Sequence, residues 1–208
     1  MGRIIRFEDR GFGSNCYLFS DDDGASSVVI DPSASPESTS TAFGALLPTV
    51  KAILLTHAHA DHMLALKEWK ETTGAPVLVG RFDRYALRDR EANVAYLFGL
   101  PGDFGDADMS LDDGEAIAVG DEKLTVLHTP GHTAGSVCFL SRDALFSGDT
   151  LFSQGGVGRT DFFGGSDEAL ADSVARLLAL SPSLRVFPGH GPETTVERER
   201  IYHGYRIP

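Results

Sequence analysis

Cysteine is scarce in this sequence, with only two among 208 residues. A pair of cysteines forms at most one disulfide, which excludes a small fold held together by a disulfide framework. Cys16 and Cys138 both lie inside apolar, strand-like runs. We therefore expect both to be buried thiols.

Long apolar runs and an excess of positive charge are also missing. No run approaches the roughly 20 apolar residues of a membrane span, and the first residues lack the apolar stretch of a secretory signal. The expected location is therefore the cytoplasm, with no membrane partner. The chain has 18 Lys and Arg residues against 30 Asp and Glu, a net charge of −12. Such a field repels phosphate backbones, so nucleic acid is not expected as a partner.

What is present indicates a folded protein, because 42% of the residues are hydrophobic and 23% are charged. The length fits one domain and no linker divides the chain, so we expect a single domain over residues 1–208. Two strand-rich halves, each followed by helices, predict an α/β fold of two packed sheets with helices outside. The predicted strands are 3–8, 15–20, 27–30, 51–55, 76–79, 116–119, 123–127, 137–140, 144–146 and 184–187, and the predicted helices are 39–47, 63–72, 84–98, 167–180 and 193–202.

The predicted helix at 84–98 leads into the loop G-L-P-G at 99–102, with aromatic residues nearby. Loops that close over a substrate commonly have this position beside a site. We interpret residues 84–102 as a candidate lid.

The most informative segment is T-H-A-H-A-D-H at 56–62, directly after the predicted strand 51–55. Side chains of His57, His59 and Asp61 project to one side only while the backbone is extended. A helix would separate the first two by about 200° around its axis. The motif therefore belongs on a loop at a strand end, where it offers metal ligands. The alternative is a helix cap at Asp61 with solvated histidines.

Three glycine-containing turns, each after a strand-like run, add metal-ligand residue types. They are P-G-H-T at 130–133, S-G-D-T at 147–150 and P-G-H-G at 188–191. With the first motif they supply five imidazoles and two carboxylates, enough for two metal ions if one carboxylate bridges. A structural zinc site needs only four ligands and usually recruits cysteine.

Together with G-D-T-L-F at 148–152 and P-G-H-G-P at 188–192, these motifs resemble those of the metallo-β-lactamase superfamily in order and spacing. Within it they are most similar to the short, single-domain hydrolases related to glyoxalase II (hydroxyacylglutathione hydrolase). The resemblance spans nearly the whole chain and implies a four-layer αββα sandwich with the site at one edge. It also implies the ligands of two metal ions, which are His57, His59 and His132 for one, Asp61, His62 and His190 for the other, and Asp149 as the bridge.

The segment G-G-V-G-R-T-D-F at 155–162 is similar to a loop that follows the bridging aspartate in these proteins. In glyoxalase II a basic residue of that loop helps to bind glutathione. Arg159 stands at the matching position, so the resemblance implies that Arg159 binds substrate.

The implied reaction is hydrolysis of a small-molecule thioester, S-lactoylglutathione or a related acyl thiol. Two divalent ions would share a water whose pKa falls to about 7, which gives a hydroxide nucleophile. Asp61 and Asp149 are the expected catalytic carboxylates, with Asp61 orienting the hydroxide. Zinc is the expected metal, and iron and manganese are alternatives because a His/Asp set accepts all three.

Asp31, Thr56 and Thr133 lie next to predicted ligands or strand ends, and we expect them to orient ligand imidazoles. Asp31 is interpreted equally well as a strand-end residue. His128 and His203 match no ligand position and are expected to be structural or solvated.

Three other activities of the superfamily stay open. Persulfide dioxygenases share T-H-x-H-x-D-H and G-R-T-D but use one iron held by two histidines and an aspartate, and the P-G-H-G-P turn argues against them. Lactonases keep all seven ligands, whereas β-lactamases lack the bridging aspartate. An RNA-processing nuclease is disfavoured by the net charge. The acyl group, the thiol and the oligomeric state are not predicted.

Overall fold

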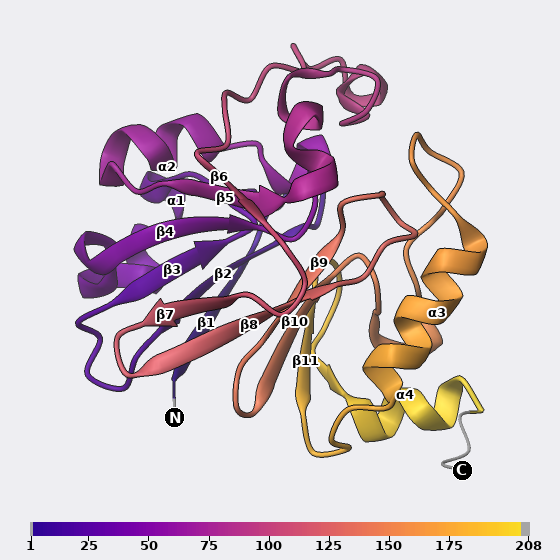
Figure 1. The fold of residues 1–208 in the computed structure, drawn as a ribbon. Helices are drawn as coiled ribbons and strands as arrows, with labels where there is room; N and C mark the ends of the chain where they lie inside the picture. Colours follow the sequence, from indigo (N-terminus) through magenta and orange to yellow (C-terminus); the bar gives the residue numbers. More distant parts are fainter. Residues whose placement is uncertain (1, 205–208) are drawn as a thin grey trace.

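The computed structural model describes residues 2–204 and has two six-stranded sheets packed face to face (Figure 1). Strands follow one another in sequence order within each sheet. The first sheet contains β1 (Arg3–Glu8), β2 (Asn15–Ser20), β3 (Ser27–Ile30), β4 (Val50–Leu55), β5 (Val77–Gly80) and β6 (Met109–Leu111). The second contains β7 (Ala116–Val119), β8 (Glu122–His128), β9 (Val137–Leu140), β10 (Ala144–Gly148), β11 (Arg185–Pro188) and β12 (Thr194–Thr195).

Helices cover the outer face of each sheet (Figure 1). The first sheet is covered by α1 (Pro36–Phe43) and α2 (Leu66–Thr73), and the second by α3 (Asp167–Leu178) and α4 (Val196–Tyr202). Three apolar clusters fill the three interfaces between these layers, with Trp69 in the first, Phe146 between the sheets and Leu177 in the third. The predicted αββα arrangement is confirmed.

The first helix begins and ends earlier than predicted. Ser35 caps it by accepting a hydrogen bond from the Ser38 N–H, and proline occupies its first turn, where a missing N–H costs nothing. Gly44 has a positive φ of 49° and ends it. The chain then continues as a 3₁₀ helix, η1 (Gly44–Thr49), which contains Pro48.

The single helix predicted at 84–98 is wrong. The chain forms two 3₁₀ helices there, η3 (Arg81–Arg88) and η4 (Ala95–Phe98). Between them the buried Asn93 amide donates to the carbonyls of Ala86 and Gly102 and accepts from the Ala95 N–H. These side-chain hydrogen bonds take the place of helical backbone bonds, so the chain turns at Asn93 and does not continue as one helix.

Three further elements differ from the prediction. Strand β6 lies outside every predicted strand. Residues 194–195 were predicted to be helical but form strand β12, which pairs with β11. The predicted helix at 63–72 begins at Leu66, after a short 3₁₀ turn, η2 (Ala60–His62).

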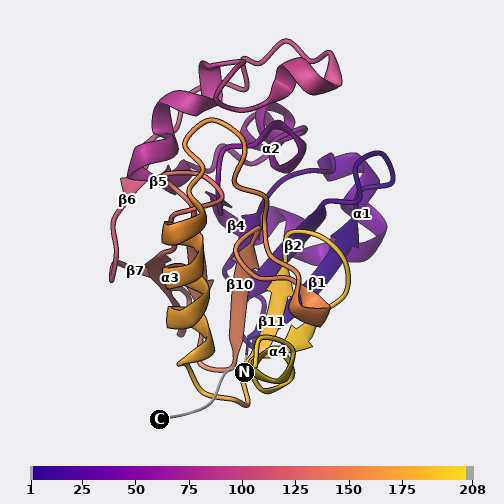
Figure 2. The same ribbon diagram turned by 90° about the vertical axis from the view of Figure 1, so that its right-hand side faces the viewer.

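Parallel strands bring the predicted site residues to one edge of the sandwich. In the first sheet β3, β4 and β5 run parallel, so Asp31, the loop 56–62 and Asp83 all follow carboxyl ends at the same edge. In the second sheet β10 and β11 run parallel and lead to Asp149 and His190. Loops at carboxyl ends of parallel strands are the usual place for ligands in such sheets. Figure 2 shows the magenta segment with η3 and η4 at the same end of the molecule as the orange loop that precedes α3.

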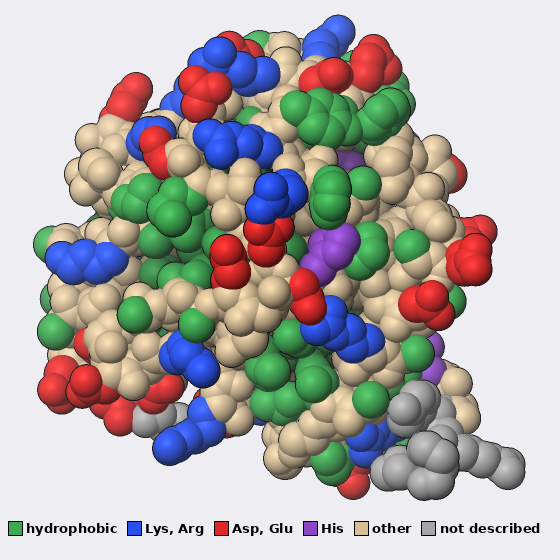
Figure 3. Space-filling model, in the orientation of Figure 1, with side chains coloured by type: hydrophobic (Ala, Val, Ile, Leu, Met, Phe, Trp, Pro, Cys, Tyr) green, Lys and Arg blue, Asp and Glu red, His purple; other side chains and the backbone are tan. Residues whose placement is uncertain are grey.

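Both cysteines are buried and free. Burial raises the pKa of the Cys138 thiol to about 11 and that of Cys16 further still, so both stay protonated at neutral pH. On the face shown in Figure 3, Lys and Arg side chains are interspersed with Asp and Glu. Within residues 2–204, no helix combines the length and apolar character needed to cross a membrane.

Candidate metal centre

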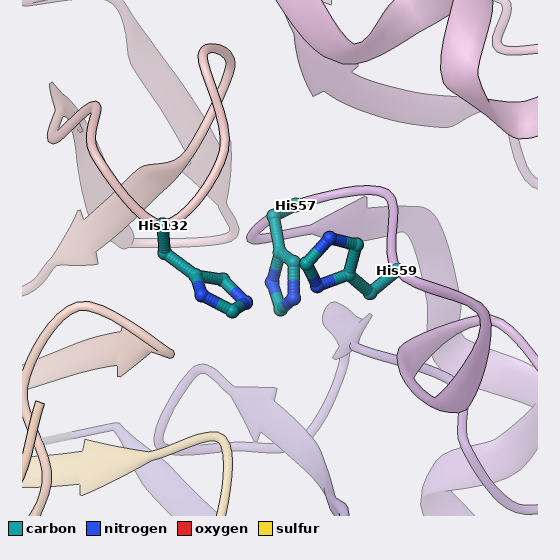
Figure 4. A group of neighbouring side chains, drawn as sticks. All are labelled: His57, His59 and His132. Atoms are coloured by element: carbon teal, nitrogen blue, oxygen red, sulfur yellow. The ribbon is translucent and has the colours of Figure 1, made fainter. Parts of the chain in front are cut away.

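Three histidine side chains converge from two separate loops (Figure 4). His57 and His59 come from the loop after β4, and His132 comes from the turn after β8. Their ring centroids lie 4.5 to 4.8 Å apart. Each Nε2 is buried and has no hydrogen-bond partner within residues 2–204. Buried polar atoms are rarely left unpaired, and three converging imidazole nitrogens fit a divalent cation.

A second group lies beside the first and contains Asp61, His62 and His190, whose ligand atoms lie within 4.8 Å of one another. The His190 Nε2 is 3.1 Å from the Asp61 Oδ2. Asp149 faces both groups, with its Oδ1 3.4 Å from the His62 Nε2 and its Oδ2 3.6 Å from the His132 Nε2. This is the position that a bridging carboxylate must occupy.

Protonation within the cluster also suits metal binding. Burial lowers the pKa of His59 to about 3 and that of His57 well below its ordinary value, so both imidazoles are neutral and present a lone pair. Burial likewise disfavours charge on His62, but Asp61 and Asp149 outweigh it and raise the pKa of His62. His62 in turn brings the pKa of Asp149 to about 2, against the opposing effect of burial. A place where carboxylates stabilise a positive charge is one that favours a divalent cation.

One carboxylate contacts an imidazole of each group, one of them directly and the other through a hydroxyl. The Asp31 Oδ2 lies 3.1 Å from the His62 Nδ1 and accepts a hydrogen bond of 2.7 Å from the Thr56 hydroxyl, whose oxygen lies 3.1 Å from the His57 Nδ1. The Thr56 N–H donates to the Asp31 Oδ1 at 2.7 Å. Contacts at Nδ1 leave Nε2 free to bind a metal.

The expectation that Thr133 orients an imidazole is wrong. Its hydroxyl donates to the Asp83 Oδ2 at 2.8 Å, while the His132 Nδ1 faces the Arg159 carbonyl at 2.7 Å. The Thr133 hydroxyl bonds to the buried carboxylate of Asp83 and not to the imidazole, and the sequence did not reveal this carboxylate.

That carboxylate, Asp83, is buried and links the two loops of the first group. It accepts hydrogen bonds from the Ala58 N–H (3.0 Å), the Thr133 hydroxyl and the Gly135 N–H (2.8 Å). Burial raises its pKa despite these donors. Asp83 follows β5 in a polar stretch that matches no motif. Its place after a predicted strand is the one feature of the sequence that could have identified it.

Asp83→Ala is expected to lower the free energy of unfolding by about 3 kcal/mol, because three buried donors lose their acceptor. Metal content should fall as well, since the loops of His57 and His132 are no longer held together. Urea unfolding followed by circular dichroism, compared with Asp83→Asn, measures the effect. Unfolding of Asp83→Ala at the wild-type urea concentration would contradict this role.

The loop before β2 supports the second group, and sequence reasoning missed it. The Ser14 hydroxyl donates to the Asp61 Oδ2 at 2.8 Å, and the Gly13 carbonyl lies 3.2 Å from the His190 Nδ1. The Asn15 amide donates to carbonyls of the turn that carries His190. These residues lie far from the motifs in sequence, so no local pattern links them.

Two glycines allow the loops to approach. A Cβ on Gly189 would lie 2.1 Å from the Asp149 Oδ1, and one on Gly148 would lie 2.4 Å from the Thr56 Oγ1. Gly148 also has a positive φ of 48°. Both positions therefore require the absence of a side chain for the ligands to converge.

A cavity of about 320 Å³ lies above the cluster. It is lined by both groups of predicted ligands, by the loop 152–162 and by part of the candidate lid, which confirms that η4 lies at the site. Arg159 lines the cavity, but its guanidinium donates two hydrogen bonds to the Asp161 carboxylate, at 2.6 and 2.5 Å. The guanidinium also lies 3.9 Å from the centre of the Phe162 ring.

The chain belongs to the metallo-beta-lactamase superfamily, whose family model matches residues 9–190. The fold and the His/Asp cluster define a metallohydrolase superfamily member with a site suited to divalent ions. The chain is similar to the probable metallo-hydrolase YqgX of Bacillus subtilis (37% identity, 90% of this chain and 89% of that protein). It is also similar to the hydroxyacylglutathione hydrolase GloC of Haemophilus influenzae (34% identity, 91% of each chain).

Solved structures agree with this assignment. The B3 metallo-beta-lactamase BLEG-1 superposes with a TM-score of 0.88 (34% identity, 96% of this chain and 97% of that chain). TTHA1623 in a di-iron-bound form gives 0.81 (36% identity, 93% and 96%). ETHE1 from Myxococcus xanthus gives 0.75 (28% identity, 97% and 82%).

Proposed function

We propose that this protein is a dinuclear metal-dependent hydrolase of thioesters, acting on S-lactoylglutathione or a related acyl thiol. The observation that carries the proposal is the convergence of seven ligand-type side chains in two groups, with Asp149 facing both. The similarity to GloC supports the reaction.

In this proposal His57, His59 and His132 would hold one ion and Asp61, His62 and His190 would hold the other, with the Asp149 carboxylate facing both groups. When bound, the ions supply Lewis acidity and lower the pKa of water to about 7. Asp61, fixed by the Ser14 hydroxyl, orients the attacking water and accepts its proton. The cavity walls hold the acyl group. A thiol leaving group has a pKa near 8.5, so its departure needs little help from an acid.

Zinc is the metal we propose for both positions, because imidazole and carboxylate ligands suit it. The di-iron form of TTHA1623 makes iron the main alternative. Affinity alone does not select between them, so metal supply in the cell decides.

A single-iron persulfide dioxygenase is the second candidate, supported by the likeness to ETHE1. The second group favours the hydrolase, because His190 approaches Asp61 and His62 in a complete three-ligand set. A mononuclear enzyme needs only one set.

Metal-loaded protein is expected to release free thiol from S-lactoylglutathione or another acyl thioester, and a chelator is expected to abolish the release. The matched assays are oxygen consumption with glutathione persulfide and hydrolysis of a β-lactam. Oxygen consumption by protein with one iron per chain would replace the proposal with the dioxygenase.

A further inference from the structure

The cavity above the two groups has an apolar wall. Its rings lie close to the ligands, with the Phe162 ring centroid 5.9 Å from that of His59 and the Phe152 centroid 6.1 Å from that of His190. Apolar rings thus flank both groups. The apolar side chains of the wall are Val94, Leu97, Phe98, Phe152 and Phe162.

Val94 occupies an unusual backbone conformation at this wall. Its φ is +53°, which branched residues rarely adopt, and only 2% of its surface is exposed. Leu97 and Phe98 follow in η4 and are partly exposed at the mouth. The Phe98 ring is packed edge-on against Phe12, 4.8 Å between centroids, which holds η4 against the loop before β2. The strained turn therefore presents a row of apolar side chains to the substrate.

Within residues 2–204, the cavity lining offers a substrate carboxylate no unpaired Lys or Arg side chain. Arg159 is the only Lys or Arg among the described residues that line it. The Asp161 carboxylate accepts hydrogen bonds from the Nε and Nη2 of Arg159, which form one edge of the guanidinium, and the flat face of the guanidinium lies over the Phe162 ring. This fork-shaped pair holds a negative charge against the guanidinium, so Arg159 attracts a substrate carboxylate less strongly than an arginine without a partner would.

We propose that the site selects thioesters with an apolar acyl group and an uncharged thiol portion, and that Asp161 determines this preference by holding Arg159. The inference rests on the proposed thioester hydrolysis and, within it, favours a related acyl thiol over S-lactoylglutathione. The cavity volume of about 320 Å³ lies at the low end for small-molecule sites, which suits an acyl group with a short neutral thiol better than a charged tripeptide.

A binding measurement with non-hydrolysable ligands tests the inference separately from the hydrolysis reaction. Calorimetry of the metal-loaded protein compares two non-hydrolysable thioethers, S-hexyl-N-acetylcysteamine and S-hexylglutathione. We expect the neutral thioether to bind about fivefold more tightly. Asp161→Asn should strengthen binding of S-hexylglutathione by about fivefold and leave the neutral thioether unchanged. The double variant Asp161→Asn, Arg159→Ala should lose that gain.

The dependence of the hydrolysis rate on acyl chain length tests whether the apolar wall contacts the acyl group. On N-acetylcysteamine thioesters, kcat/KM should rise by about fourfold for each methylene added from acetyl to butyryl. Leu97→Ser should remove most of this rise, measured as the ratio of kcat/KM between the butyryl and the acetyl thioester. Met109→Ser is the matched control, because Met109 is similarly exposed, 54% against 50%, and lies on β6 away from the cavity lining.

Tighter binding of S-hexylglutathione by the wild type, or an Asp161→Asn effect equal for both thioethers, would overturn the inference. Tight binding of the neutral thioether by a protein that hydrolyses no thioester would support the preference and reject the proposed reaction.

Discussion

Replacement of Asp149 by alanine is expected to abolish hydrolysis, with kcat lowered by roughly 1,000-fold. The Asp149 carboxylate faces both groups, with its Oδ1 3.4 Å from the His62 Nε2 and its Oδ2 3.6 Å from the Nε2 atoms of both His132 and His190. Loss of an outer partner of a metal ligand typically costs 10–100-fold in metal affinity. Loss of a ligand shared by two ions should cost more, so the variant should also retain fewer than two metals per chain.

Asp149→Asn separates charge from shape at this position. It keeps the size of the side chain, removes the negative charge and leaves one acceptor oxygen, so we expect it to be nearly as inactive as the alanine variant. Steady-state kinetics and metal analysis of both variants, with urea unfolding as the check on folding, make the measurement. A variant that binds two metals and keeps a tenth of the wild-type kcat would contradict the bridging role.

Asp31→Ala should have the second largest effect, on stability as well as on metal binding. The carboxylate is buried and accepts hydrogen bonds from the Thr56 N–H and hydroxyl, while facing the His62 Nδ1. Its φ of +51° is strained for alanine. Unpaired buried donors and this strain together should lower the free energy of unfolding by about 3–4 kcal/mol. Metal affinity should fall by about 10–100-fold.

Asp31→Asn is the matched variant, since asparagine tolerates a positive φ and keeps an oxygen for the Thr56 N–H. It should recover most of the stability but not the metal affinity, because it lacks the charge that orients His57 through Thr56 and His62 directly. Chemical denaturation in chelator gives the first quantity, and competition with a metal-binding dye gives the second. Full metal affinity in Asp31→Asn would show that the residue acts only as a strand end.

Much of the site could be predicted because its ligands lie in short motifs at strand ends. The alternating spacing predicted that His57 and His59 project together, whereas Asp61 lies in the 3₁₀ turn η2 and groups with His62 instead. The glycine turns at Gly148 and Gly189 marked close approaches. Ten of the twelve strands within residues 2–204 were predicted to within a few residues, because apolar runs bounded by turn residues are a local property, whereas β6 and β12 were missed. Parallel pairing then brings these ends to one edge.

What could not be predicted depends on contacts between distant segments. Asp83 and Ser14 reach the site through the tertiary structure, across 50 and 47 positions to Thr133 and Asp61. The helix predicted at 84–98 fails for a more local reason, since the Asn93 amide donates to the carbonyls of Ala86 and Gly102, 7 and 9 positions away, where a helix would use backbone bonds. Arg159 lines the cavity above the cluster, but the sequence did not show that the Asp161 carboxylate pairs with its guanidinium.

The most direct measurement is anomalous scattering from crystals of the metal-loaded protein, collected on both sides of the metal absorption edge. The proposal predicts two peaks, one among His57, His59 and His132 and the other among Asp61, His62 and His190, with Asp149 contacting both. A single peak in a fully loaded crystal, or ions bound elsewhere on the chain, would contradict it.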